Sequence, residues 1–368
     1  MINTYVPYIT NKEKQSLSSS LNSSYVSTAG PKINEFEKLF NKIFKFKYSV
    51  ALNSGTSALH LALLASGVQK DDLVITPSYS FAATANAITY TGAAPWFFDC
   101  DKNFILDIKK VEEALLKTTK FQSNCLIEKS SGKIIRAIVP VQTFGKKMQF
   151  SEYEKFAKKY KLKIIFDSAA CHDPKIFNLK KTNNSIFCFS FNGNKTITTG
   201  AGGILATNSS KLSNKVRIYS TVGKKKSNYD YQLIGYNYKM TNLQASMGIS
   251  QLKNLKNILN KKKRIFEYYD KKIKQSLIYL KIYDKSYINW VFVLKLKNSK
   301  IFKNIKKKFN SSNIQLNYFW KPLHLQKPYK NFKKDNLSFS NKLWKKILIL
   351  PSHPGITKKD QNKILRIL

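Results

Sequence analysis

The sequence predicts an α/β protein with a mostly parallel central sheet between layers of helices, followed by a smaller C-terminal α/β domain. Short apolar runs rich in β-branched and aromatic residues recur through the first part of the chain. Most of these runs are separated by segments in which apolar residues recur at helical spacing. Such alternation is typical of parallel strands joined by helical crossovers, and ligands of such sheets bind at the carboxyl ends of the strands.

The expected strands are near-continuous apolar runs bounded by polar or turn-forming residues. They cover residues 72–77, 95–100, 133–141, 163–168, 185–191 and 202–208. Helical spacing is found at residues 56–67, 107–117 and 150–160, and a longer helical stretch covers residues 241–273. Beyond this stretch the pattern changes to short mixed elements that begin with INWVFVLKLK. We therefore expect a large domain over residues 1–250 and a small domain over residues 251–368.

The composition is that of a folded globular protein. Of the 368 residues, 43% are hydrophobic and 13% are aromatic, whereas disordered chains are poor in both. The formal net charge of +43 suggests a polyanionic partner such as nucleic acid. However, only four of the 64 basic residues are arginine, and the lysines are spread along the chain. Because nucleic-acid recognition relies on the bidentate guanidinium group, we expect solvated lysine faces and no nucleic-acid partner.

The cysteines and the first residues of the chain predict a reduced, cytoplasmic protein. Cys100, Cys125, Cys171 and Cys188 show neither a CxxC pair nor a zinc-binding spacing, so no metal site is expected. The chain begins with MINTYVPYITNKEK, which has no apolar signal core. No stretch approaches the ~18 consecutive apolar residues of a membrane span. We therefore expect no membrane partner and a location in the cytoplasm.

A first candidate site lies in NSGTSALHLAL, residues 53–63, where small turn-forming residues lead into an apolar helix. Gly55 stands at the start of this helix. Free backbone N–H groups at such a start, with the hydroxyl groups of Thr56 and Ser57, can hold a phosphate group. The alternative is an ordinary Ser/Thr helix cap that binds no ligand.

Two further candidate groups follow expected strands. Tyr79 and Phe81 come just after the strand at 72–77, where an aromatic face can stack on a flat ring, although core packing explains both equally well. Asp167 comes at the end of the strand at 163–168. A carboxylate there needs a cationic or hydrogen-bonding partner, and a protonated pyridine nitrogen would be one. The alternative for Asp167 is capping of the next turn.

Lys195 lies in FSFNGNKTITTGAGG, residues 189–203, among Ser, Asn, Gly and Thr at the end of an apolar run. Partial desolvation in such a turn lowers the pKa of an amine, and an amine of this kind can form a Schiff base. The alternative is one more surface lysine. GNKT and GAGG lack the spacing and the following helix of the Walker and dinucleotide-binding motifs, so neither kind of nucleotide site is expected.

In chain order, the Gly-Thr helix start, the aromatic residue after a strand, the strand-end Asp167, and Ser190 five residues before Lys195 resemble the fold-type I pyridoxal-phosphate enzymes. More narrowly, the chain resembles the nucleotide-sugar aminotransferases of the DegT/StrS type, and within them the perosamine and legionaminate branch. The resemblance covers nearly the whole chain. It is also carried by VSTAGPKINEFE, NSGTSALHLALLASGV, CLIEKSSGKIIRAIVPVQTFG, GYNYKMTNLQASMG, WKPLHLQKPYK and LPSHPGITKKDQ.

The resemblance implies that pyridoxal 5'-phosphate is the cofactor. Lys195 would bind its aldehyde as a Schiff base and then shuttle protons, and Asp167 would pair with the pyridine nitrogen. Phe81 would stack on the cofactor ring. The phosphate would be held by Gly55, Thr56 and Ser190. The implied reaction moves an amino group from glutamate to a 4-keto-6-deoxy nucleotide sugar, giving a 4-amino sugar for surface-glycan biosynthesis.

The resemblance also implies contributions from more distant segments. Asn237, in GYNYKMT, would reach the phosphate of the neighbouring subunit, which implies a homodimer with shared active sites. His324, in PLH, and Lys239 are weaker candidates for binding the nucleotide sugar. Loop packing is the alternative for His324.

Three positions depart from the family's pattern. Phe166 stands in place of an acidic residue, and Lys239 in place of an Arg, so the planar fork is lost while the charge is kept. Ala170 stands in place of a Glu or Gln that lies near the cofactor's phenolic oxygen. We expect Ala170 to alter the electronics of the cofactor or to lower the rate.

Three alternative functions stay open on the sequence. A pyridoxal-phosphate-dependent sugar dehydratase would share the fold, but the resembling dehydratases carry His in place of Lys195. A catalytically altered or regulatory homologue is suggested by Ala170 and the other departures. A polyanion-binding protein, which belongs to a different class, is suggested by the net charge alone.

Overall fold

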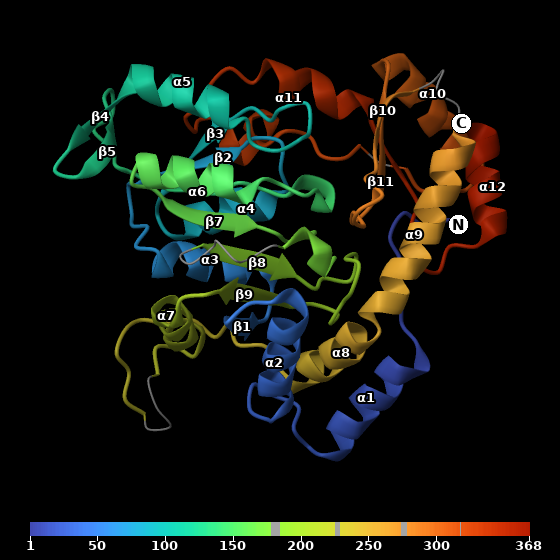
Figure 1. Ribbon diagram of the computed structural model, residues 1–368, viewed down its shortest axis with the longest axis horizontal. Coiled ribbons are helices and arrows are strands. Elements are labelled where there is room, and N and C mark those ends of the chain that lie inside the picture. Colours follow the sequence, from blue (N-terminus) through green and yellow to red (C-terminus); the bar gives the residue numbers. More distant parts are fainter. Residues whose placement is uncertain (178–184, 225–228, 274–277, 317) are drawn as a thin grey trace.

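A computed structural model of the chain shows a seven-stranded sheet with helices on both faces (Figure 1). The structure describes residues 1–177, 185–224, 229–273, 278–316 and 318–368. The strand order is β1-β9-β8-β7-β6-β2-β3, and the strands are parallel except β9, which runs antiparallel to both of its neighbours. The strands are β1 (Tyr48–Leu52), β2 (Leu73–Pro77), β3 (Ala94–Phe98), β6 (Ile135–Ile138), β7 (Lys163–Asp167), β8 (Ile186–Ser190) and β9 (Gly203–Thr207).

Two separate apolar cores lie on the two faces of this sheet. The larger one is formed with α2 (Lys32–Phe44), α5 (Ile108–Thr118), α6 (Phe150–Lys159) and α8 (Asn242–Lys253), and α1 (Asn11–Asn22) packs on α8. The other is formed with α3 (Gly55–Ala65), α4 (Ala82–Tyr90) and α7 (Ser210–Ser220). A hairpin of β4 (Thr119–Gln122) and β5 (Cys125–Glu128) extends beyond the sheet. The expected α/β class is therefore confirmed.

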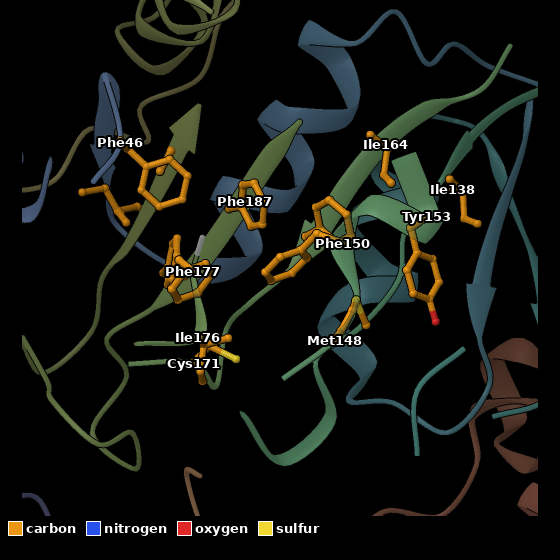
Figure 2. Close-up of a cluster of buried hydrophobic side chains, with 14 of the residues drawn as sticks. Phe46, Ile138, Met148, Phe150, Tyr153, Ile164, Cys171, Ile176, Phe177 and Phe187 are labelled. Carbon is orange, nitrogen blue, oxygen red and sulfur yellow. The ribbon is translucent and has the colours of Figure 1, made fainter. Parts of the chain in front are cut away.

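Side-chain alternation along β7 and β8 decides which residues point toward each face of the sheet. In β7, Phe166 packs in the α6 core, whereas Ile165 packs in the α3 core. In β8, Phe187 packs on the α6 side, where its ring lies 5.2 Å from that of Phe150 (Figure 2). Because successive side chains of a strand point to opposite faces, the last residues of both strands point toward the α3 face.

The C-terminal part contains a second, antiparallel sheet with its own core. Its strands, in spatial order, are β10 (Ile278–Ile282), β11 (Phe292–Leu296) and β12 (Ile347–Leu350). The helices around it are α9 (Leu255–Lys272), α10 (Ser299–Ser311), α11 (Ser338–Leu343) and α12 (Lys358–Ile367). Leu255 of α9 packs in the large core and Phe266 packs in the small one. Helix α9 thus connects both parts, and the domain boundary near residue 250 stays a prediction.

The stretch expected to be helical over residues 241–273 is helical in the structure, and it is divided into two helices. Helix α8 ends at Lys253, and α9 begins at Leu255. Asn254 lies between them, where it ends the first helix and begins the second. The chain passes from the large core to the small one along α9, whose Leu255 and Ile258 pack in the first and whose Ile265 and Phe266 pack in the second. Within the described residues, no helix combines the length and apolarity needed to cross a membrane.

Candidate active site

Asp167 ends β7, and its carboxylate is fixed by two hydrogen bonds. Its Oδ2 accepts from the Thr84 hydroxyl at 2.6 Å, and its Oδ1 accepts from the Ala169 N–H at 3.1 Å. The residue is 5% exposed, and burial raises the pKa of its carboxyl, although these hydrogen bonds and the nearby Lys195 oppose that rise. A buried carboxylate has acceptor capacity beyond two bonds, so this one is suited to a cationic ligand such as a protonated ring nitrogen.

Lys195 lies in the turn that follows β8, where its backbone N–H donates to the Asn192 carbonyl at 2.9 Å. Burial lowers the pKa of its ammonium group to about 8. Asp167 and Cys171 oppose this shift, because they attract the charged form. At that pKa about a tenth of the lysine is uncharged at pH 7. Because the uncharged amine is the nucleophile, Lys195 is suited to attack a carbonyl carbon at neutral pH.

The start of α3 and the end of β8 meet closely beside Lys195. Ser54 caps the helix by accepting from the Ser57 N–H at 3.0 Å. The first N–H groups of an α-helix have no partner inside the helix and attract anions. A Cβ atom added to Gly55 would lie only 2.7 Å from the Cβ of Ser190. Glycine is therefore required at position 55 for space, and the helix start and the Ser190 side chain border the same volume.

One cavity brings six of the predicted residues together. Its lining includes Gly55, Thr56, Phe81, Asp167, Ser190 and Lys195. Phe81 precedes α4, is 58% exposed, and lies 6.0 Å from the Trp320 ring between centroids, so its face is accessible to a flat ligand. Tyr79, the other aromatic candidate, is fully buried in a hydrophobic cluster, and the core-packing alternative describes it.

Asn237 and Lys239 do not line this cavity within one subunit. Asn237 is exposed on a segment that forms an isolated bridge with Thr221. Lys239 bridges to Leu52 at the end of β1 and is partly buried. Burial and the nearby Arg217 lower the pKa of the Lys239 ammonium group.

His324 is also outside the cavity lining. The residue is 6% exposed, its Nδ1 shares a hydrogen bond with the Ser78 hydroxyl at 2.5 Å, and its Nε2 shares one with Asn341 Oδ1 at 2.8 Å. Both ring nitrogens thus form hydrogen bonds, one to the loop after β2 and the other to α11. These contacts are those of loop packing, which was the alternative for this residue.

Of the departures from the family's pattern, Phe166 lies away from the cavity and Ala170 lines it. Phe166 points away from the cavity into the α6 core, where its ring stacks on Phe187 with centroids 4.8 Å apart. Ala170 lines the cavity. A Cβ atom added to the neighbouring Gly145 would meet the Ala170 carbonyl at 2.6 Å and the Trp290 nitrogen at 2.9 Å. Ala170 and Trp290 therefore adjoin on one wall of the cavity.

The sequence did not indicate several residues that orient Asp167 or line the cavity. Thr84 orients Asp167, and three aromatic residues from the C-terminal part supply an apolar wall, namely Trp290, Phe319 and Trp320. Trp320 belongs to the WKPLHLQKPYK segment, so that motif could have suggested it. No group of three or more His, Cys, Asp or Glu side chains in the described part of the chain is arranged to hold a metal ion.

The fold and the cavity together define a class of enzyme. A buried carboxylate ends one strand, a lysine of lowered pKa follows the next, and a helix start with free N–H groups lies beside them. These are the parts that bind the ring nitrogen, the aldehyde and the phosphate of pyridoxal phosphate in fold-type I enzymes, and they fit that cofactor. The chain belongs to the DegT/DnrJ/EryC1/StrS aminotransferase family, whose model matches residues 7–368.

Relatives and solved structures agree with this membership. The chain is 30% identical to GDP-perosamine synthase of Caulobacter vibrioides over 378 residues, covering 100% of this chain and 97% of the relative. It is 35% identical over 271 residues to UDP-4-amino-4,6-dideoxy-N-acetyl-beta-L-altrosamine transaminase of Campylobacter jejuni, covering 70% of this chain and 67% of the relative. A crystal structure of a DegT DnrJ EryC1 StrS aminotransferase from Brucella abortus superimposes with a TM-score of 0.85 at 26% identity, covering 97% and 94% of the two chains.

Proposed function

We propose that the protein transfers an amino group from glutamate to a 4-keto-6-deoxy nucleotide sugar, giving a 4-amino sugar for surface-glycan biosynthesis. The observation that carries this proposal is the meeting of Lys195, Asp167 and the α3 start at one cavity. Family membership supports transamination. The Campylobacter jejuni relative, whose name includes a 4-amino-4,6-dideoxy sugar, supports position 4 as the site of amination.

Each residue at the cavity has its own role in the proposed reaction. Bound pyridoxal phosphate supplies an electron sink and carries the amino group between the two substrates. Asp167 keeps a proton on the ring nitrogen, because a carboxylate favours the charged form of a cation next to it. Lys195 Nζ would move a proton from the donor's α-carbon to the cofactor carbon that carries the amino group, and would move a proton in the opposite direction in the second half-reaction, and its pKa of about 8 suits it to both directions. The α3 N–H groups and the Ser190 hydroxyl bind the phosphate.

The proposal includes a homodimer in which Asn237 of the partner subunit reaches the phosphate. The segment that carries this residue exposes large apolar side chains, with Tyr229 at 85% and Ile234 at 90% exposure. Tyr90 is also more than half exposed. Such side chains are typical of a surface that a second copy covers.

The proposal also places the reaction in the cytoplasm. Cys100, Cys125, Cys171 and Cys188 are all free, and three of them are buried. Free cysteines are the ordinary state in a reducing compartment. A reducing compartment is therefore consistent with the proposed location.

A substrate screen tests the proposed function. Purified protein would be incubated with pyridoxal phosphate, glutamate and a set of nucleotide-activated 4-keto-6-deoxy sugars, and product masses would be read with Lys195→Ala as the control. We expect one ketosugar to exchange its keto oxygen for an amino group in the wild type only. Cofactor binding without turnover of any ketosugar would favour the altered or regulatory homologue that Ala170 suggests. Loss of water from the sugar would favour the dehydratase.

A further inference from the structure

Trp290, just before β11, lies directly beside the amine of Lys195. The Lys195 Nζ atom is 3.9 Å from the centroid of the indole ring. An ammonium group over the face of an indole is attracted by the negative face of the π-system, and the attraction is largest where water is excluded. Trp290 is 4% exposed and Lys195 is partly buried, so water has limited access to this contact.

The indole ring is held in this place by contacts on several sides. Its Nε1–H donates to the Asn194 carbonyl at 2.7 Å, which ties the ring to the residue before the lysine. The backbone of Trp290 donates to the Phe144 carbonyl at 2.9 Å and accepts from Lys262 Nζ at 2.8 Å. Tyr5 stacks on the ring at 5.3 Å with an interplanar angle of 18°. The backbone is therefore fixed, and the ring cannot turn away without breaking its Nε1–H bond to Asn194 and its stacking on Tyr5.

Other groups around the amine do not replace this contact. Asp167 attracts the ammonium from the β7 side, Cys171 and His172 follow on the same loop, and Lys262 lines a small pocket together with Lys195 and Trp290. Ala170 adjoins Trp290 on the same wall and has no polar side chain. On this wall the indole face is therefore the group that attracts the Lys195 ammonium.

We propose that Trp290 is a positioning residue whose indole face holds the Lys195 ammonium inside the cavity whenever that amine is not bonded to the cofactor. This inference rests on the proposed role of Lys195. During turnover the amine is released and must stay close to the reacting carbon. A lysine side chain has several rotatable bonds, so a resting place for the free ammonium limits where it can move.

The test measures the protonation of Lys195 in the full-length protein without cofactor. The rate at which an amine-reactive ester labels Lys195 would be followed by peptide mass spectrometry from about pH 6 to 10. Trp290→Leu removes the indole face, so the midpoint of this profile should fall by about half a unit to one and a half units. Trp290→Phe keeps a ring that attracts cations less strongly, so its midpoint should lie between the two.

Trp320→Leu is the matched control, because Trp320 lines the same cavity but contacts Phe81 and Phe144. Its midpoint should equal that of the wild type. An unchanged midpoint in Trp290→Leu, or an equal fall in Trp290→Phe and Trp290→Leu, would overturn the proposal. These readouts need no cofactor and no substrate, so they stand even if the proposed transamination is not observed.

A second measurement covers the case in which Trp290→Leu does not fold. The chain contains four tryptophans, so protein labelled with 5-fluorotryptophan has four fluorine resonances. The resonance that is absent in Trp290→Phe should shift with pH at the Lys195 midpoint. It should stop shifting in Lys195→Met. A Trp290 resonance that ignores pH in the wild type, or still shifts in Lys195→Met, contradicts the proposal.

Discussion

Replacing Gly55 by alanine tests the phosphate-binding end of the cavity with a single methyl group. The added Cβ would lie 2.7 Å from the Cβ of Ser190 and 3.2 Å from its Oγ. Carbon atoms in contact normally lie about 3.5–4.0 Å apart, so α3 and β8 would have to separate by roughly 1 Å. The Cβ of Ser190 cannot rotate away, because the backbone fixes its position and Ser190 ends a strand in the middle of the sheet.

The size of the effect follows from this overlap. Overpacking of this kind costs about 1–3 kcal/mol, and the gain from replacing glycine in a helix returns up to about 1 kcal/mol. We therefore expect a net loss of up to about 3 kcal/mol in the free energy of unfolding. A separation of roughly 1 Å also removes about one hydrogen bond to the phosphate, which is worth about 1.5–3 kcal/mol for a charged group. Cofactor binding should weaken about 10- to 150-fold.

The assay is a titration of each protein with pyridoxal phosphate, followed by absorbance, together with a urea unfolding curve. Gly355→Ala is the matched control, because a Cβ there would meet its nearest atom at 3.5 Å, an ordinary contact. This control should bind the cofactor as the wild type does. A Gly55→Ala protein with unchanged affinity and unchanged stability would refute the close approach of α3 and β8.

Two further predictions concern a buried lysine and the subunit interface. Burial lowers the pKa of Lys262 to about 7 from its ordinary 10.5, so the unfolded chain binds more protons in that window and stability should rise with pH from about 7 toward 10.5. In Lys262→Met the rise in urea midpoint between about pH 7 and 9 should shrink, and equal rises in both proteins would contradict this. Mixing inactive Lys195→Ala and Asn237→Ala subunits should restore up to about a quarter of wild-type activity through mixed dimers with one intact site. A mixture that stays inactive would argue against shared sites.

Much of the site could be predicted because its signals are local in sequence. A strand that ends in Asp167, a glycine-containing turn with Lys195, and a helix start at Gly55 are each visible within about ten residues. Parallel strands bring their carboxyl ends to one edge, so these local signals also predict that the three groups meet. Strand alternation then explains why Phe166, next to Asp167, lies on the opposite face.

Other features depend on contacts that no local pattern contains. Trp290 stands in the apolar run INWVFVLKLK, which carries no local sign of a cofactor site. Packing in one hydrophobic cluster with Phe144 and Ala170, which are distant in the sequence, brings it to Lys195. His324 belongs to a recognisable motif, yet its hydrogen bonds place it outside the cavity lining. The break at Asn254 is invisible because helical spacing continues through it.

Reductive trapping tests the central claim most directly. Protein loaded with pyridoxal phosphate would be treated with borohydride, digested, and searched by mass spectrometry for the modified peptide. The expected result is one stably attached cofactor, on the Lys195 Nζ of the peptide that follows β8, and none in Lys195→Ala. Attachment at a different lysine, or an unmodified Lys195 in protein saturated with cofactor, would contradict the assignment of this cavity as the active site.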